Sequence, residues 1–292
     1  MKRIRLCFYL CMTLAVSLTA GTLAQFRTVY GDIEVELYDQ ARPVTVSNFI
    51  SYVESGRYTD LFSHRLVPGF VIQGGGFVAT NRGTTNWDFH AVLTNAPIVN
   101  EFGLAPPLSN VFGTIAMAKV AGKTNSATSQ WFFNLANNTA LDANDTNNMF
   151  VVFGKVIRGT NILGIFNSFQ YWSSPWFTPA TTTNLVLHNY YTSPYNDWPL
   201  LQTAATPSAS IVDTNFLFID ITLLKVAVNP LNNGSREISW NSATGLTNVL
   251  EYTTNFPPSW QTLLTTNGTG NRVTITNNST DPERFYRIRV VY

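Results

Sequence analysis

The sequence predicts a mainly β protein, and three observations support that prediction. From Phe26 to Leu37, apolar and charged residues alternate with a period of two, the pattern of a half-buried strand. Through the middle of the chain, short apolar runs are separated by Gly, Pro and Asn, as they are where turns join strands. After residue 228, five more short apolar runs follow at regular spacing, which is typical of a β-sandwich.

Helices are expected at only two places among these strands. Pro43 suits the opening turn of the first helix, apolar residues then recur at three-to-four spacing, and Gly56 ends the pattern. The second is a short helix over residues 160–169. The other apolar segments are expected to form strands, at residues 61–77, 113–118, 130–135, 150–156 and 215–226.

The stretch from about residue 170 to 210 differs from its surroundings. It holds five prolines and a cluster of aromatic residues, and it shows no clear periodicity. A connection this long is uncommon and is normally functional or disordered. The aromatic content favours a surface insertion packed as a flap over a random linker.

Residues 227–292 are expected to form a small β-sandwich of their own. Ile238 and Trp240 should face inward beside Tyr286, Ile288 and Val290. With its Ile-Ser-Trp, Leu-Glu-Tyr and Phe-Tyr-Arg-Ile segments, the unit resembles the fibronectin-III-like domains appended to secreted bacterial proteins. No residue set in it suggests catalysis, so docking to a surface or partner protein is the expected role.

Composition and charge argue against two classes of protein. The chain has 292 residues, of which 45% are hydrophobic, and this composition argues against intrinsic disorder. Charged residues make up 12% and the formal net charge is +1. This balance argues against a nucleic-acid partner, which would require a basic face to neutralise phosphates.

The N-terminus has the pattern of a secretory signal peptide. Lys2, Arg3 and Arg5 precede an apolar run that is too short for a membrane span of about 20 residues. Small residues follow, and cleavage is expected after Ala24, which would remove residues 1–24 and export the protein to the periplasm or the exterior. The alternatives are an uncleaved N-terminal anchor and an acylated lipoprotein signal.

Removal of this leader would change the charge and the redox chemistry of the chain. It takes away three positive charges and no negative one, so the formal net charge falls from +1 to −2. It also removes Cys7 and Cys11, the only two cysteines. The mature chain is therefore expected to have no disulfide and no thiolate site, and to stay active with a reductant or a chelator.

The usual catalytic templates are missing from the sequence. His64, His90 and His188 are scattered without metal-ligand spacing, and there is no nucleophile elbow or phosphate loop. No metal or cofactor is expected. Gly74 to Gly76 are better explained as a close backbone approach in a strand than as a nucleotide-binding loop.

Three motifs carry the functional information. The first runs from Phe62 through His64-Arg65 and Pro68-Gly69-Phe70 to Gln73-Gly74-Gly75, and here the chain resembles the cyclophilin family of peptidyl-prolyl isomerases. The second comprises residues 113–119 and 124–133, and the third comprises Leu141-Asp142 and residues 150–156. The resemblance spans about residues 26–226. It implies an eight-stranded antiparallel barrel closed by two helices, within a domain that occupies residues 25–226.

The resemblance also implies a role for each motif residue. Arg65 would be the catalytic donor, Gln73 would orient it and the substrate carbonyl, and His64 would belong to the same surface. Proline-containing polypeptides would be the substrates. The residues that would bind them are Phe70, Met117, Ala118, Lys119, Gln130, Phe132, Leu141 and Phe150.

The chemistry can be argued without the family. Resonance keeps an Xaa-Pro bond planar behind a barrier of about 20 kcal/mol, and twisting it localises a lone pair on the proline nitrogen. A guanidinium that donates to this nitrogen stabilises the twisted state more than either planar state. No nucleophile, acid or metal is required.

Structural explanations for the same residues remain open. The barrel core could simply include the four apolar residues Phe70, Phe132, Met117 and Leu141. His64 could be a packing residue, and Gln73 could be a hydrogen-bonding residue at a strand end. Arg65 is harder to explain this way, because an arginine among apolar strand residues requires a partner or a cleft.

Three positions depart from the family pattern on one wall of the site. Ala140 stands where the family has Trp, Phe150 where it often has His, and Lys119 where Asn is common. Residues 143–149 also lengthen the neighbouring loop. These changes leave Arg65 in place and are expected to alter substrate preference.

The leading hypothesis is an exported isomerase that assists folding. Its rival is a proline-peptide binding or surface-adhesion module that does not catalyse isomerisation. A chain ending near Val226 is expected to fold and stay active, since few contacts should cross to the C-terminal unit.

Overall fold

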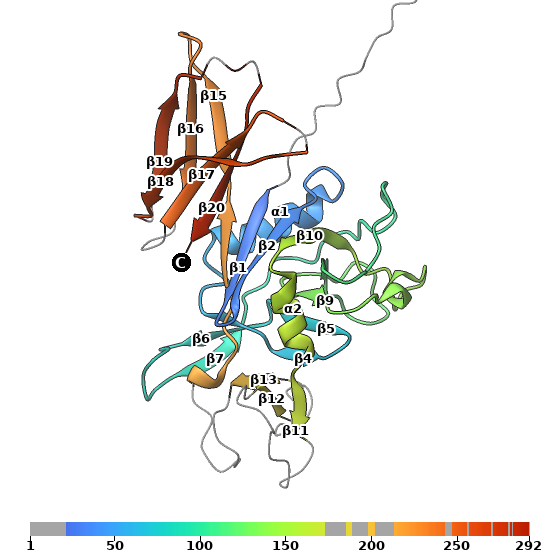
Figure 1. The fold of residues 1–292 in the computed structure, drawn as a ribbon. Helices are drawn as coiled ribbons and strands as arrows, with labels where there is room; N and C mark the ends of the chain where they lie inside the picture. Colours follow the sequence, from blue (N-terminus) through green and yellow to red (C-terminus); the bar gives the residue numbers. More distant parts are fainter. Residues whose placement is uncertain are drawn as a thin grey trace, which may run out of the picture.

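A large antiparallel sheet forms the centre of the computed structural model, which describes residues 22–172, 185–188, 198–201 and 213–291 apart from 243–246, 256, 270, 280 and 282. The strands, in the order in which they lie side by side, are β14 (Asp220–Leu224), β1 (Leu23–Thr28), β2 (Gly31–Leu37), β10 (Val152–Arg158), β8 (Thr114–Met117), β9 (Trp131–Asn134), β5 (Val71–Gly74) and β4 (Arg65–Val67). The predicted eight-stranded antiparallel architecture is confirmed (Figure 1).

Backbone hydrogen bonds bring the two ends of this curled sheet together. The Ser63 N–H donates to the Leu217 carbonyl over 2.9 Å, and the Ile219 N–H donates to the Leu61 carbonyl over 2.9 Å. Leu61 lies in β3 (Leu61–Phe62), which pairs with β6 (Phe77–Thr80) and β7 (Asp88–Ala91) in a three-stranded sheet. The half-barrel is thereby closed beside its β4 edge.

Two helices pack against the sheet, as expected. The first, α1, spans Pro43–Glu54, and α2 spans Thr160–Asn167. Phe49 of α1 and Phe166 of α2 are fully buried in the main core with strand residues such as Phe26 and Phe133. Burial of these apolar faces is the main driving force for the packing.

The first turn of α1 is capped from a distance. Its N-cap residue, Arg42, makes no side-chain cap, and the Glu101 carboxylate instead accepts from the backbone N–H groups of Val44 and Thr45 over 3.1 and 2.8 Å. A buried carboxylate at a helix N-terminus satisfies unpaired N–H groups and complements the helix dipole.

The segment predicted as one strand from Phe26 to Leu37 is a hairpin. The chain turns at Val29 and Tyr30, so Val29 is 69% exposed and β1 pairs with β2. Gly31 has a φ of +124°, which a residue with a side chain rarely adopts. Strand β1 also begins earlier than expected, at Leu23.

The structure describes three short strands of the insertion, and Trp198 in one of them packs against the rest of the protein. Residues 170–210 contain β11 (Gln170–Trp172), β12 (Leu185–His188) and β13 (Trp198–Leu201), and the other residues predicted as a flap lie outside the described part. Trp198 is 2% exposed and packs among Phe62, Phe89 and Phe216. A short 3₁₀ helix, Asp213–Asn215, then leads towards β14.

The C-terminal residues form two three-stranded sheets packed face to face (Figure 1). One contains β15 (Val226–Pro230), β16 (Arg236–Asn241) and β19 (Arg272–Asn277), and the other contains β18 (Gln261–Asn267), β17 (Thr247–Thr253) and β20 (Phe285–Val291). Ile238, Trp240 and Ile288 are buried between them as predicted, and Tyr286 is partly buried. The side chain of Val290 lies outside the described part.

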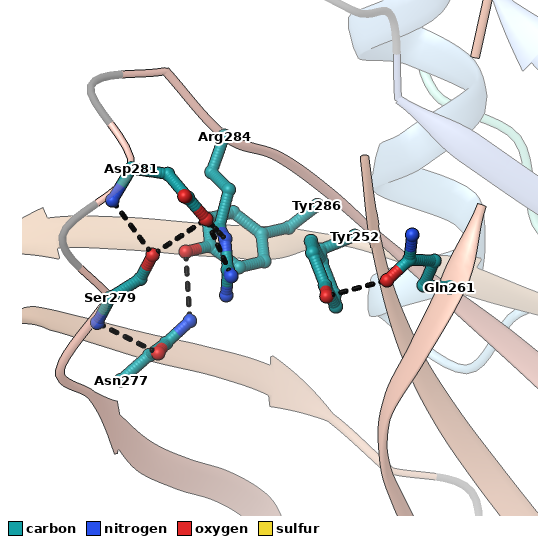
Figure 2. A network of polar contacts seen from close by, with 7 residues as sticks. All are labelled: Tyr252, Gln261, Asn277, Ser279, Asp281, Arg284 and Tyr286. Atoms are coloured by element: carbon teal, nitrogen blue, oxygen red, sulfur yellow. Dashed lines mark hydrogen bonds and ion pairs between the residues drawn. The ribbon is translucent and has the colours of Figure 1, made fainter. Parts of the chain in front are cut away.

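Polar contacts join the two sheets at one end of this unit (Figure 2). The Asn277 side-chain amide in β19 donates to the Tyr286 hydroxyl in β20 over 3.0 Å. Arg284 pairs with Asp281 over 2.6 Å, and its guanidinium carbon lies 3.8 Å from the centre of the Tyr252 ring. These contacts hold the aromatic side chains at the sheet margin in fixed positions.

The core of the C-terminal unit includes residues of the main sheet. Leu224 of β14 is 4% exposed and belongs to the same apolar cluster as Trp240 and Leu250, and Leu23 of β1 packs against that cluster. Leu23 and Leu224 thus connect the main sheet to the C-terminal core, and the boundary near residue 226 stays a prediction.

Across the part of the chain that the structure describes, none of the helices has the length and apolar character needed to cross a membrane.

Candidate active site

A tight hairpin places Arg65 opposite Gln73. Strands β4 and β5 are joined by Pro68 and Gly69, and the Phe70 N–H donates to the Val67 carbonyl over 2.9 Å. Gly69 has a φ of +72°, as the third position of a type II turn requires. Because directly opposed residues share one face of a sheet, the half-buried side chains of Arg65 and Gln73 lie on the same face.

The same face continues across the sheet as an apolar surface. Gln73 is opposite Phe132 in β9, and Phe132 is opposite Ala116 in β8. Around them lies an apolar cluster, which we call the apolar patch: Phe70, Val71, Ala116, Phe132, Leu141, Phe150 and Val152 are among its members. The Arg65 guanidinium carbon lies 5.8 Å from the centre of the Phe70 ring. The positively charged side chain of Arg65 therefore lies at the margin of the apolar patch.

A group of polar side chains fixes Gln73 next to Arg65. The Gln73 amide nitrogen donates to Gln130 Oε1 over 2.6 Å, and the His64 Nε2 atom lies 3.2 Å from the same oxygen. Gln130 Oε1 thus accepts from two neighbours. These contacts fix the orientation of both amides, because the Gln73 nitrogen must donate and the Gln130 oxygen must accept.

Burial keeps His64 neutral. The side chain is almost fully enclosed, and this desolvation lowers its pKa from 6.5 to about 4, although the hydrogen bond to Gln130 opposes the shift. The nearby charge of Arg65 lowers the pKa further. Gly76 leaves the space that the ring occupies, because a Cβ atom there would lie 2.6 Å from His64 Cε1. His64 can therefore donate to Gln130, but it is poorly suited to proton transfer near pH 7.

Lys119 contacts the wall of the site that departs from the family pattern, which contains Phe150 and the lengthened loop at residues 143–149. Its Nζ atom donates to the carbonyls of Thr146 and Asn147 over 2.8 and 3.1 Å, and it lies 4.8 Å from the centre of the Phe150 ring. The Phe150 ring in turn meets Phe132 edge-on at 5.7 Å. Burial lowers the pKa of Lys119, while Asp145 opposes that shift. The lengthened loop is thus tied to the apolar patch.

A buried network of amides positions the same wall from behind. The Asn110 side-chain nitrogen donates to Asp142 Oδ1 over 2.7 Å and to the Phe150 carbonyl over 3.0 Å. Asn138 donates to the Phe70 carbonyl over 2.8 Å and to Asn134 Oδ1 over 2.8 Å, and Asn134 donates to Asn110 Oδ1 over 3.0 Å. Asp142 ends the 3₁₀ helix Thr139–Asp142 that carries Leu141. Phe70, Leu141 and Phe150, which belong to the apolar patch and lie outside strands, are thereby connected to one network.

One of the predicted binding residues, Met117, is placed differently from the others. Met117 is opposite Trp131, one position away from Ala116 and Phe132, so it faces the main barrel core and is 2% exposed. The prediction that it lines the site is corrected by this alternation. Ala118 packs against the apolar patch, and its backbone N–H donates to the Gln130 carbonyl over 2.9 Å, so this N–H is not available to a peptide.

Sequence reasoning missed several residues of the site. Val71 and Ala116 lie in the apolar patch, and strict alternation from Gln73 and Phe132 could have placed both on this face. Asn110, Asn134 and Asn138 had no signal in the sequence, because their side chains meet only through the tertiary fold.

The site holds no set of metal ligands. Among the described residues, no three His, Cys, Asp or Glu side chains come together in a way that could bind a metal ion. What the arrangement offers is a fixed hydrogen-bond donor with a permanent positive charge beside an apolar surface. Such a site can bind an apolar ring and stabilise a developing lone pair next to it.

Comparisons with known proteins agree with this chemistry. The family described as cyclophilin type peptidyl-prolyl cis-trans isomerase/CLD matches residues 23–184. A peptidyl-prolyl cis-trans isomerase of Acinetobacter baylyi is 42% identical over 144 residues, which cover 49% of this chain and 71% of that protein. Peptidyl-prolyl cis-trans isomerase A of Dickeya dadantii is 41% identical over 148 residues, which cover 51% of this chain and 72% of that protein.

A solved structure of a cyclophilin-type isomerase from Cryptosporidium parvum, determined in the presence of the dipeptide Ala-Pro, aligns with 69% of this chain and 98% of that chain. Its sequence identity is 20% and its TM-score is 0.43. The family match covers more than half of the chain and includes every residue of the site described above. The chain therefore belongs to the cyclophilin-type peptidyl-prolyl cis-trans isomerases, enzymes that interconvert the cis and trans forms of the peptide bond before proline.

Proposed function

We propose that Arg65 is the catalytic residue and that it acts on the nitrogen of the substrate proline. The row of Arg65, Gln73 and Phe132 across three neighbouring strands is the observation that supports this role. Twisting the Xaa-Pro bond removes its resonance and leaves a lone pair on that nitrogen. A guanidinium fixed beside it is a stronger partner for the twisted bond than for either planar form, so it lowers the barrier.

The apolar patch would receive the proline ring. Phe132 would form the floor, with Phe70, Leu141 and Phe150 around it, since these side chains already pack together. If the proline ring is held in place while the preceding residue rotates, the rotation is confined to the Xaa-Pro bond. Gln73 would orient Arg65 and the carbonyl before proline, and Gln130 and His64 would act as positioning residues for Gln73.

An extended polypeptide is the substrate class that suits this surface. Strand β8 ends at Met117, and the Ala118 carbonyl and the backbone of Lys119 lie beyond it, where they could pair with a peptide backbone. Backbone pairing is independent of side chains, which would let the enzyme accept many proline-containing chains.

The binding role of the apolar patch can be tested with matched phenylalanine variants. Phe132→Ala is expected to raise KM for a short Xaa-Pro peptide by about tenfold, because the proline ring loses its floor. Phe112→Ala is the control, since Phe112 is 41% exposed and lies outside the apolar patch. Phe132→Leu keeps the core filled and should show a smaller rise. Equal KM values in all folded variants would place the proline elsewhere.

We further propose that the enzyme is exported and assists the folding of other exported proteins, with the C-terminal unit as a docking accessory. The basic and apolar pattern of the leader supports export. Cell fractionation of the full chain and of a chain without its leader tests this. A leader-bearing chain that stays unprocessed in the cytoplasm would contradict export.

A further inference from the structure

The N-terminal end of the described chain is anchored by three hydrogen bonds. The Thr22 backbone N–H donates to Asp39 Oδ2 over 2.6 Å, and the Thr22 hydroxyl donates to Asp39 Oδ1 over 2.8 Å. The Thr22 carbonyl accepts from the Leu37 N–H over 2.9 Å. Both oxygens of one carboxylate are therefore engaged by a single residue.

The next two residues are integral to the fold. Leu23 and Ala24 begin β1, where they pair with Glu36 and Val35 on one side and with Leu224 and Leu223 on the other. Ala24 is fully buried in the main core. Leu23 packs against the cluster that joins β14 to the C-terminal unit.

Cleavage after Ala24 would remove all three of these residues. The protein would lose the Asp39 contacts, the start of β1 and one side chain of the shared core. The pattern of small residues required for leader removal also occurs three residues earlier, in Thr19-Ala20-Gly21. A cut after Gly21 satisfies that pattern and leaves every described contact of Thr22, Leu23 and Ala24 in place.

We propose that a signal peptidase removes the leader between Gly21 and Thr22, and that the new α-ammonium group of Thr22 pairs with the carboxylate of Asp39. This inference depends on the proposed export. Water is the second reactant: its hydroxyl joins the Gly21 carbonyl carbon, the C–N bond breaks, and the Thr22 nitrogen takes a proton. The amine so formed is protonated at neutral pH and lies where an N–H already meets Asp39. Hydrolysis thus replaces a neutral donor by a charged one, which makes a stronger hydrogen bond.

The mass of the exported protein tests the position of the cut. The full chain is expressed in a bacterium with a general secretion system, and the exported product is analysed by intact mass and N-terminal sequencing. A product that begins at Thr22 is the expected result. A product with any other start, Gln25 included, overturns this inference and leaves export standing, and so does an exported chain that keeps its leader. A chain that stays unprocessed in the cytoplasm overturns both.

Two leader variants sharpen the same experiment. Gly21→Leu places a large residue directly before the proposed cut and should abolish processing at Thr22. Ala20→Leu is the matched control, because the middle position of the small-x-small pattern accepts large residues. If Gly21→Leu is processed as efficiently as the unchanged chain, the proposed position is wrong.

The ion pair has its own test. Asp39→Asn keeps the shape of the side chain and removes its charge, so it should lower Tm by about 1–3 °C in the chain that begins at Thr22. In a chain that retains Ala20 and Gly21, Thr22 keeps an amide N–H and the same substitution should cost less. Equal losses in the two chains would contradict the pairing.

Discussion

Burial of His64 links a single residue of the site to the pH dependence of the whole protein. The pKa of His64 is about 4 in the folded chain, compared with the ordinary value of 6.5 for histidine, because burial of the ring disfavours its protonated form. As pH falls below 6.5, the unfolded chain takes up this proton first, and the folded chain follows only near pH 4. The titration of His64 should therefore lower the free energy of unfolding by on the order of 3 kcal/mol between pH 6.5 and pH 4. Above pH 7, His64 should have no effect on the free energy of unfolding.

Chemical denaturation of His64→Gln tests this, since the amide can still donate to Gln130. The variant should lose less stability than the unchanged protein as pH is lowered over that window. His90→Gln is the control, because His90 is exposed. Identical pH slopes for all three proteins would show that His64 is not the group responsible.

The sequence motifs predicted which residues lie together better than they predicted the face of the strand that each side chain occupies. Arg65, Gln73 and Phe132 were found from motif and chemistry, and the structure places them in one row. Met117 was assigned to the site because it belongs to a motif, yet it points into the core. A shift of one residue reverses the face of a strand, and the motif alone does not fix that parity.

At the scale of elements, the amide network holds segments that have no strand to position them. Asn110 and Asn134 are both fully buried, and together with Asn138 and Asp142 they connect the backbone at Phe70 and Phe150 with the Leu141 turn. We expect Asn110→Ala to raise KM by about three- to tenfold and to change kcat by less than about twofold, because the wall loosens while Arg65 stays in place. Steady-state kinetics on a short Xaa-Pro peptide provide both values.

Conservative variants separate positioning from a general loss of stability. Asp142→Asn keeps an oxygen that can accept from Asn110, so it should retain a lower KM than Asp142→Ala. Asn86→Ala is the control, since Asn86 is exposed and remote from the network. If Asn110→Ala folds with unchanged kcat and KM, the wall does not depend on this network.

Elements with strong periodicity were predictable and those defined by tertiary contact were not. Both helices and the strands β16 to β20 follow the sequence pattern closely, whereas β15 was not predicted. The β1–β2 hairpin was read as one strand, because an apolar Val29 continues the alternation through what is a turn. The cap of α1 comes from Glu101, more than fifty residues away in sequence, and no local pattern could show it.

For the whole molecule, the shared core changes what truncation should do. A chain that ends at Val226 keeps β14 and the entire site, so its kcat/KM should stay close to that of the full chain. It exposes Leu23 and Leu224, which pack against the C-terminal cluster. Its free energy of unfolding should therefore be about 2–4 kcal/mol lower, given about 1.5–3 kcal/mol for each fully buried leucine. Urea denaturation and activity assays on both chains test this.

Polar replacement of Leu224 provides the matched comparison. Leu224→Ser should destabilise the full chain, where the side chain is buried, more than the truncated chain, where it is exposed. Equal stability of the full and truncated chains would mean that the C-terminal unit adds nothing to the barrel. Loss of kcat/KM in a folded truncated chain would show instead that the unit contributes to the site.

The rate of proline isomerisation in Arg65 variants tests the central claim most directly. kcat/KM would be measured on a short Xaa-Pro peptide for the unchanged chain, Arg65→Ala and Arg65→Lys, with circular dichroism to confirm folding. We expect Arg65→Ala to lower kcat/KM by at least about tenfold, because the lost interaction acts on the twisted state. Arg65→Lys should recover only part of the rate, since an ammonium lacks the planar fork of donors. An unchanged kcat/KM in folded Arg65→Ala would contradict the account.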